Sequence, residues 1–124
     1  MRKEEHVVYV DDTVTYEPPL HSGTANRRLV PAELGAGFEL VHGTIEPGGM
    51  GHRHSHVSEW QVILLLEGEG RLELNDEPPQ MLKAGAVVRI PPGTRHLFEV
   101  TGTTPAKVLV IYSPPLGKDG FVAA

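Results

Sequence analysis

Apolar and polar residues alternate along most of this chain, in short segments that are separated by glycine, proline or acidic turns. Alternation with a period of two places successive side chains on opposite faces of an extended strand. No stretch shows the longer period of an amphipathic helix. The pattern predicts strands within segments 6–16, 26–31, 37–49, 59–70, 71–75, 80–85, 86–93, 96–102 and 106–115. We therefore expect an all-β fold, an antiparallel β-barrel or jelly roll with little or no helix.

Glycine and acidic residues predict where the chain reverses direction between these segments. Glycine adopts the positive φ angles that tight turns require, and aspartate side chains stabilise turns by hydrogen-bonding to nearby backbone groups. The expected turns lie at Asp11-Asp12 within 6–16, at Gly48-Gly49 where 37–49 ends, and at Gly68-Glu69-Gly70 before 71–75. The last of these would make 59–70 and 71–75 a hairpin.

The composition supports short strands joined by tight turns. The chain has Gly 14 and Pro 11 among its 124 residues, and 40% of its residues are hydrophobic. A chain of this length is predicted to form a single domain, residues 1–124. We expect the core barrel to span about residues 37–115, with N-terminal strands within 6–30. The tail 117–124 lacks periodicity and is expected on the surface.

Charge and cysteine content exclude several kinds of partner and site. The net charge is −5 and basic residues form no run longer than a pair, which argues against a nucleic-acid partner. No segment approaches the roughly 20 apolar residues of a membrane span. The N-terminus lacks the apolar region of a signal peptide, so we expect a cytoplasmic protein. The chain has no cysteine, so it forms neither a disulfide nor a thiolate metal site.

The most apolar segment of the chain predicts a second subunit. Residues 62–66 are apolar at every position, whereas an antiparallel strand with one face in water alternates. One face of this strand must line the barrel, and the other must also be covered. A homodimer provides that cover, and the alternative is that the chain's own N-terminal strand does so.

Three histidines have the spacing of a metal site. His54 and His56 are one residue apart, so both imidazoles point to the same face of a strand. His96 follows the proline–glycine turn of Pro91 to Thr94, in a distant part of the sequence. A β-barrel brings such segments together, and imidazoles are good ligands for transition metals.

These residues resemble the two motifs of the cupin superfamily. The first motif has a glycine, two histidines one residue apart, a glutamate and a closing glycine. The second has a glycine, a Pro-x-Gly turn, a histidine and an asparagine. The matching residues are Gly48, His54, His56 and Gly68 in the first motif, and Gly85, Pro91, Gly93 and His96 in the second. The resemblance implies a small single-domain cupin and extends over nearly the whole chain.

The sequence departs from the cupin motifs at two positions. Gln61 stands where the family has its glutamate ligand, and Val100 stands where it has asparagine. A shifted alignment that takes His52, His54 and Glu59 restores a carboxylate, but it loses both glycines of the first motif. We therefore prefer the alignment that includes Gln61.

The resemblance implies one divalent transition metal per chain, held by His54, His56, Gln61 and His96. Three nitrogens and one oxygen favour zinc, with nickel, iron and copper as alternatives. Glutamine contributes a neutral carbonyl oxygen, so no ligand offsets the charge of the metal and its Lewis acidity is high. With a glutamine at this position, the chain resembles the small cupins that act as aromatic polyketide cyclases.

Further residues are candidates for catalysis and for the pocket. Glu59 has the strand parity of Gln61 and is a candidate base. His52 is a candidate ligand or proton shuttle, and Tyr112 a candidate proton donor. Whether His21 joins the site is left open. The expected substrate pocket is lined by the apolar residues Met50, Ile63 and Phe98.

Three functions are consistent with these residues. The first is Lewis-acid catalysis of the cyclase, isomerase or lyase type on an apolar or aromatic carbonyl compound. The second is a non-haem metal dioxygenase, and the third is a non-catalytic module that binds a small molecule or a metal. Activity without oxygen would distinguish the first from the second.

Overall fold

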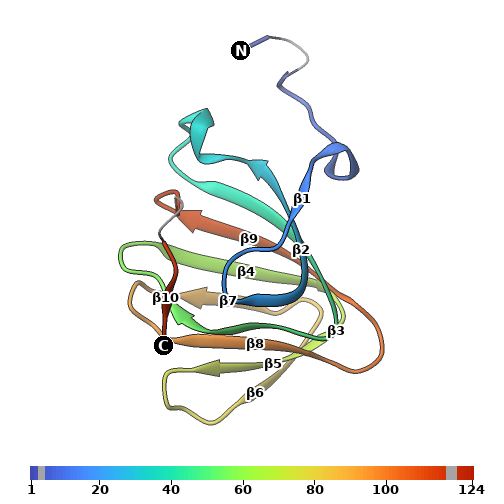
Figure 1. Ribbon diagram of the computed structural model, residues 1–124, viewed down its shortest axis with the longest axis vertical. Coiled ribbons are helices and arrows are strands. Elements are labelled where there is room, and N and C mark those ends of the chain that lie inside the picture. The colour runs from blue at the N-terminus through green and yellow to red at the C-terminus, as the bar shows by residue number, and fades with distance from the viewer. Residues whose placement is uncertain (3–4, 117–119) are drawn as a thin grey trace.

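The chain folds into a curled antiparallel β-sheet, seen in a computed structural model that describes residues 1–2, 5–116 and 120–124 (Figure 1). The described residues contain β1 (Thr15–Tyr16), β2 (His21–Val30), β3 (Glu39–Ser55), β4 (Trp60–Glu67), β5 (Glu69–Leu74), β6 (Gln80–Lys83), β7 (Val87–Ile90), β8 (His96–Thr101), β9 (Ala106–Ser113) and β10 (Val122–Ala123). Two short 3-10 turns, η2 (Val10–Asp12) and η3 (Ala32–Leu34), precede β3. The prediction of an all-β antiparallel barrel with little helix is confirmed. No helix in the described part of the chain is long and apolar enough to cross a membrane.

Strand β3 joins the two halves of the barrel, of which one contains β9, β4 and β7 and the other contains β8, β5 and β6. Its residues 39–45 pair with β9, and its residues 50–54 pair with β8 on the other side. Strand β2 runs antiparallel beside both parts of β3. The prediction of a chain reversal at Gly48-Gly49 is wrong, because the strand continues through these residues as an irregular bend. Gly48 has a φ of +80°, which bends the strand without reversing it.

The predicted hairpin of 59–70 with 71–75 is also wrong. Strand β4 pairs with β7 and β9, whereas β5 pairs with β6 and β8. At Gly68, with φ +90°, the chain therefore crosses from one half of the barrel to the other. A Cβ atom at Gly68 would lie 2.8 Å from the Cα atom of Ala106 and 2.9 Å from the carbonyl oxygen of Pro105.

We predict that Gly68→Ala lowers the free energy of unfolding by about 2–4 kcal/mol, because the methyl group meets backbone atoms and the φ angle is strained. Gly102→Ala is the matched control, since Gly102 has φ +82° and a methyl group added there would meet no atom within 4 Å. Gly102→Ala therefore tests the φ strain alone and should lower the free energy of unfolding by about 1 kcal/mol. Urea unfolding of both variants measures the two costs, and equal losses would contradict the role given to Ala106.

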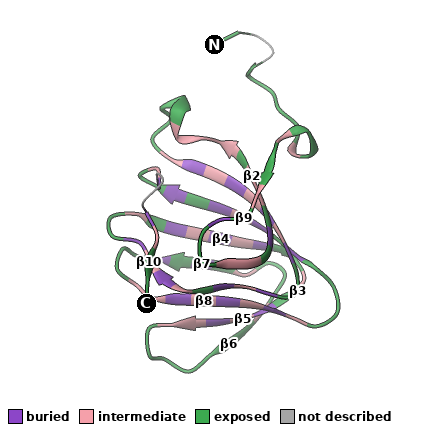
Figure 2. Cartoon of the chain, in the orientation of Figure 1, coloured by how far each residue is buried: buried purple, intermediate pink, exposed green. Residues whose placement is uncertain are grey.

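Buried and exposed residues alternate along the strands that enclose the core (Figure 2). The inward residues include Val41 on β3, Leu65 on β4, and Val108 on β9, all at most 4% exposed. The prediction for segment 6–16 is half right: η2 forms a turn at Asp11 and Asp12, but only Thr15–Tyr16 forms a strand. The hydrophobic core thus begins at Val41 on β3, and no described residue before β3 belongs to it.

Candidate metal centre

Three buried imidazoles meet inside the barrel. His54 lies near the end of β3 and His96 at the start of β8, where the two residues are register partners. His56 follows β3 directly, and the three residues are only 2–4% exposed. One ring nitrogen from each histidine lies within 4.8 Å of the other two. Segments that are forty residues apart in the sequence therefore form a single cluster of nitrogen donors.

Backbone carbonyl groups fix the orientation of all three rings. Each Nδ1 atom lies within hydrogen-bond distance of a carbonyl oxygen, which accepts only, so Nδ1 carries the proton and Nε2 does not. The acceptors are His52 for His54 at 2.6 Å, Gly120 for His56 at 2.7 Å, and Thr94 for His96 at 3.0 Å. The Nε2 atoms of His54 and His96 are buried and have no hydrogen-bond partner among the described residues. A lone pair that is buried without a partner is costly unless a cation binds it.

The electrostatic environment keeps the three imidazoles neutral. Burial, together with the nearby imidazole of His96, lowers the pKa of His54 to about 3. Burial likewise lowers the pKa of His96 to about 4, and it lowers the pKa of His56. Neutral imidazole is the form that binds metal ions, so the cluster needs no deprotonation at neutral pH.

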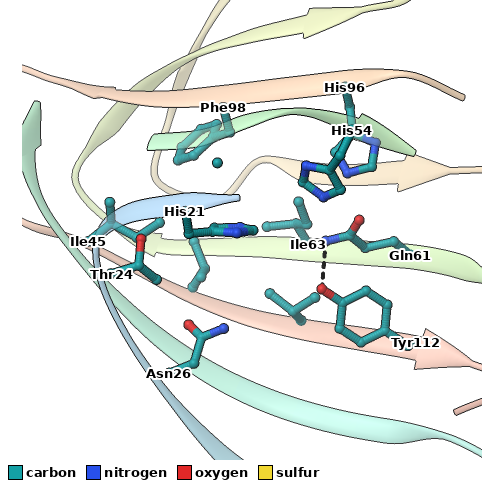
Figure 3. A pocket seen from close by; sticks show the side chains of 13 residues that line it. His21, Thr24, Asn26, Ile45, His54, Gln61, Ile63, His96, Phe98 and Tyr112 are labelled. Carbon is teal, nitrogen blue, oxygen red and sulfur yellow. Dashed lines mark hydrogen bonds between the residues drawn. The ribbon is translucent and has the colours of Figure 1, made fainter. Parts of the chain in front are cut away.

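Gln61 lies beside the cluster on β4, 5% exposed. Its Oε1 atom is 3.1 Å from Nε2 of His56, and its Nε2 atom donates to the hydroxyl oxygen of Tyr112 at 3.3 Å (Figure 3). Gln61 and Tyr112 are register partners on β4 and β9, which explains this contact. In this orientation the amide oxygen of Gln61 and the unprotonated nitrogen of His56 are two acceptors that face each other. A shared cation would stabilise that arrangement.

A pocket lies next to His54 and His96, and apolar side chains form much of its wall (Figure 3). The space open to the centres of water molecules is about 50 Å³, which is room for a few waters. Of the three residues expected to line the substrate pocket, Ile63 and Phe98 line this one and Met50 does not. Gly51 faces the pocket instead, so its neighbour Met50 points to the opposite side of β3.

Of the other candidate residues, Tyr112 lines the pocket, whereas Glu59 and His52 lie outside the histidine cluster. Tyr112 lines the pocket and is buried, and burial raises the pKa of its hydroxyl group. Glu59 lies before β4, with its carboxylate 3.4 Å from the backbone nitrogen of Ser58, and its charge offsets a small part of the lowering that burial causes in the pKa of His56. His52 is exposed because the register between β3 and β8 shifts between Gly51 and His54. Neither His52 nor Glu59 belongs to the cluster of three donors.

Two residues near the cluster could not be assigned from the sequence. His21 begins β2 and lines the pocket, with its ring centroid 5.4 Å from that of His54. Phe121 packs on His54 and His56 at centroid distances of 5.2 and 5.0 Å. The prediction that the tail lies on the surface is therefore wrong for Gly120 and Phe121, whereas Val122 and Ala123 are exposed. Gly120 is buried, and β10 pairs with His54 and its neighbour on β3. The part of the tail at 117–119 lies outside the described residues.

The sequence profile of the cupin domain matches residues 41–112, more than half of the chain. The chain belongs to the cupin family. An uncharacterized protein of Methanocaldococcus jannaschii is 30% identical to this cupin over 95 residues, which is 75% of each chain. A germin-like protein of Arabidopsis thaliana, subfamily 2 member 1, is 31% identical over 96 residues. That match covers 74% of this cupin and 44% of the germin-like protein.

Solved structures share the fold of this cupin. The polyketide cyclase RemF from Streptomyces resistomycificus superposes with a TM-score of 0.81 at 24% identity, over 100% of this chain and 86% of that one. A predicted oxalate decarboxylase from Thermotoga maritima superposes with a TM-score of 0.79 at 23% identity, over 87% of this chain and 98% of that one. At these identities the likeness establishes the fold alone.

Proposed function

We propose that this cupin binds one divalent transition metal, zinc first among the candidates, and uses it as a Lewis acid on a small carbonyl compound. The observation that carries the proposal is the pair of buried Nε2 atoms, on His54 and His96, that have no partner among the described residues. The proposed ligands are these two histidines, His56 and Gln61. Three imidazole nitrogens and one amide oxygen suit zinc, nickel, iron or copper better than magnesium or calcium.

The metal would supply polarisation of a carbonyl oxygen, which lowers the energy of an adjacent enolate. The chain's own residues provide the surroundings for that chemistry. One wall of the pocket is formed by the apolar side chains of Ile63, Phe98 and Val110. Apolar surface there keeps water away from the bound molecule, which strengthens electrostatic interactions inside the pocket. Tyr112 accepts a hydrogen bond from the amide of Gln61 and so helps to direct its carbonyl oxygen toward His56.

Burial keeps the Tyr112 hydroxyl protonated at neutral pH, because it raises the pKa of that group. Tyr112 is therefore suited to donate a hydrogen bond or a proton, and unsuited to act as a base. Glu59 is the proposed base, since its carboxylate lies close enough to His56 to affect the pKa of the ring. The exposed His52 has no part in this proposal.

The apolar wall supports an apolar or aromatic substrate over a sugar phosphate, because no lysine or arginine among the described residues lines the pocket. The space of about 50 Å³ indicates a small molecule. The likeness in fold to a protein named as a polyketide cyclase supports carbonyl chemistry. The same small space favours a second candidate, a non-catalytic module that holds a metal.

We predict that protein purified without an affinity tag carries about one transition-metal ion per chain, detected by elemental analysis. A chelator should remove the ion, and Zn²⁺ should restore it. The metal-loaded protein is then incubated in D₂O with a small β-diketone, and exchange of its α-protons is followed by NMR. Lewis-acid catalysis predicts exchange that depends on the metal and is equal in air and under nitrogen.

Each of the other results of this assay points to a different function. Metal binding without exchange for any of several β-diketones would favour the non-catalytic module. Consumption of the diketone only in air would favour a dioxygenase. A protein that neither carries nor takes up a transition metal would overturn the whole proposal. Protein heated beyond its unfolding temperature is the control for exchange caused by free Zn²⁺.

A further inference from the structure

A second cavity shares part of its wall with the pocket beside the histidines. Asn26 of β2 and Tyr112 of β9 line both spaces (Figure 3). The second cavity, which we call the aromatic cleft, also has Tyr16, Arg28 and Phe121 in its wall. The space open to the centres of water molecules is about 200 Å³ in the aromatic cleft, against about 50 Å³ in the pocket. A molecule too long for the pocket would therefore extend past Asn26 and Tyr112 into the aromatic cleft.

Strand β2 gives the two spaces a polar side. His21 and Asn26 are register partners of Gly51 and Gly43 on β3. A Cβ atom at Gly43 would lie 2.7 Å from Oδ1 of Asn26, and one at Gly51 would lie 2.9 Å from Nε2 of His21. The two glycines thus leave room for two polar side chains of β2 inside the barrel. Arg28 follows Asn26 by two residues, so it lies on the same face of β2 and extends the polar row into the aromatic cleft.

The rest of the aromatic cleft is formed largely by flat side chains. Tyr16, Tyr112 and Phe121 come from β1, β9 and the tail, and Pro18 and Pro19 lie between β1 and β2. Aromatic rings offer a large apolar contact area with little loss of side-chain entropy, and they pack well on other rings. The wall therefore favours an aromatic ring in the ligand. Phe121 also packs on two histidines of the cluster, which places such a ring close to the metal centre.

Arg28 is the one cation among the described residues that line the aromatic cleft. Its guanidinium carbon lies 4.0 Å from the centroid of the Tyr16 ring, which orients the planar group. Its Nε atom lies 4.0 Å from Oε2 of Glu39, too far for a hydrogen bond but near enough to balance the charge. The N–H groups of Arg28 therefore remain able to donate to a ligand. The negative charge of Glu39 favours a neutral acceptor there over a carboxylate.

We propose that the pocket and the aromatic cleft form one binding site for an elongated aryl ketone. The carbonyl end lies beside the histidines, the ring packs on Tyr16 and Phe121, and a hydroxyl group at the far end accepts a hydrogen bond from Arg28. The small pocket then receives the carbonyl end alone. The position of the carbonyl end rests on the metal chemistry proposed above. Recognition of the ring and of the hydroxyl group does not depend on it.

Calorimetric titration of the Zn²⁺-loaded and the metal-free protein tests the proposal with four diketones. These are acetylacetone, benzoylacetone, and the para-hydroxy and para-carboxy derivatives of benzoylacetone. Benzoylacetone should bind about tenfold more tightly than acetylacetone, because its ring packs in the aromatic cleft. The para-hydroxy derivative should gain about another tenfold from a hydrogen bond to a charged group. The para-carboxy derivative should bind no more tightly than benzoylacetone.

Variants of the aromatic cleft separate the contributions of its residues. Arg28→Met keeps the apolar stem, so it should weaken the para-hydroxy derivative about tenfold and leave benzoylacetone unchanged. Tyr16→Leu should weaken both compounds, whereas Tyr16→Phe keeps the ring and should bind them as the wild type does. Arg89→Met is the matched control, because Arg89 is an exposed arginine on β7 that lines neither space. A readout without any variant is the nuclear Overhauser effect between the ligand ring and Phe121, which should be observed.

A para-hydroxy derivative that binds no more tightly than acetylacetone would overturn the proposal. Unchanged affinity of that derivative in Arg28→Met, or equal weakening in Arg89→Met, would overturn the role of Arg28. Tightest binding of the para-carboxy derivative would overturn the preference for a neutral group. Failure of the proposed metal chemistry gives a different result: no diketone exchanges its α-protons, yet binding still depends on Arg28. That result would support the aromatic cleft and reject the Lewis-acid function.

Discussion

Replacing His96 with alanine is expected to weaken Zn²⁺ binding by more than about 100-fold, because loss of a ligand exceeds the 10–100-fold effect of losing a residue that only supports a ligand. His54→Ala should have an effect of the same size. Both side chains present a buried Nε2 atom without a partner among the described residues. The barrel should stay folded, because its core of aliphatic residues lies on strands that do not depend on the ion.

Competition with a chromophoric chelator measures the affinity, and thermal unfolding gives a second readout. At Zn²⁺ equal to 100 times the wild-type Kd, the ion should stabilise the wild type by about 2.7 kcal/mol, but a 100-fold weaker site by only about 0.4 kcal/mol. His42→Ala is the matched control, since His42 lies on β3 opposite Leu109, outside the histidine cluster. Wild-type affinity in both His54→Ala and His96→Ala would mean that the ligand set is wrong.

The parts of this structure that follow from local pattern could be predicted from the sequence. The apolar segments that form β4, β8 and β9 are bounded by turn residues, which is a property of each segment alone, so the sequence predicts these strands close to where they lie. The convergence of His54, His56 and His96 also follows from local rules. His54 lies near the end of β3 and His56 directly after it, and His96 begins the neighbouring strand after a turn.

The pairing of strands could not be predicted in the same way. A glycine between two strands is compatible with a hairpin and with a crossover, because both need a positive φ angle. At Gly68 the chain crosses over, and Pro105 and Ala106 at the start of β9 pack closely against it. This contact joins segments that are distant in the sequence, so the local pattern does not predict it. Met50 lies outside the pocket next to the histidines for a related reason. An irregularity in β3 changes which residues point inward, and Gly51 takes the inward position.

The residues that complete the site from the two ends of the chain give little sequence signal. His21 follows two prolines and resembles a loop residue, yet it begins β2 and lines the pocket. Gly120 acts through its backbone carbonyl oxygen, which any residue type possesses, so no motif marks it. Phe121 is the one aromatic residue of the tail and is the available hint that the tail packs on something. These contacts depend on the closed barrel rather than on local pattern.

Gln61→Glu is expected to raise the affinity for Zn²⁺ and to lower the stability of the metal-free protein. A carboxylate near a divalent ion gains Coulomb energy, so Zn²⁺ should bind about tenfold more tightly or better, after the cost of burying the charge. Without metal, the charge is buried beside His56 and Tyr112, and the protein should lose about 1–3 kcal/mol of unfolding free energy. Thermal unfolding with and without Zn²⁺ measures both effects.

The effect of Gln61→Glu on activity separates the proposed chemistries. In Lewis-acid catalysis, the added negative charge lowers the pull on a substrate carbonyl oxygen, so the exchange of β-diketone protons should slow. In a dioxygenase, glutamate restores the usual cupin ligand set and should preserve or increase oxygen-dependent turnover. Glu59→Gln is the matched comparison, because it removes a charge close to His56 from a residue outside the cluster. If Gln61→Glu leaves affinity, stability and activity unchanged while Glu59→Gln weakens Zn²⁺ binding, the oxygen ligand is Glu59 and the neutral ligand set proposed above is wrong.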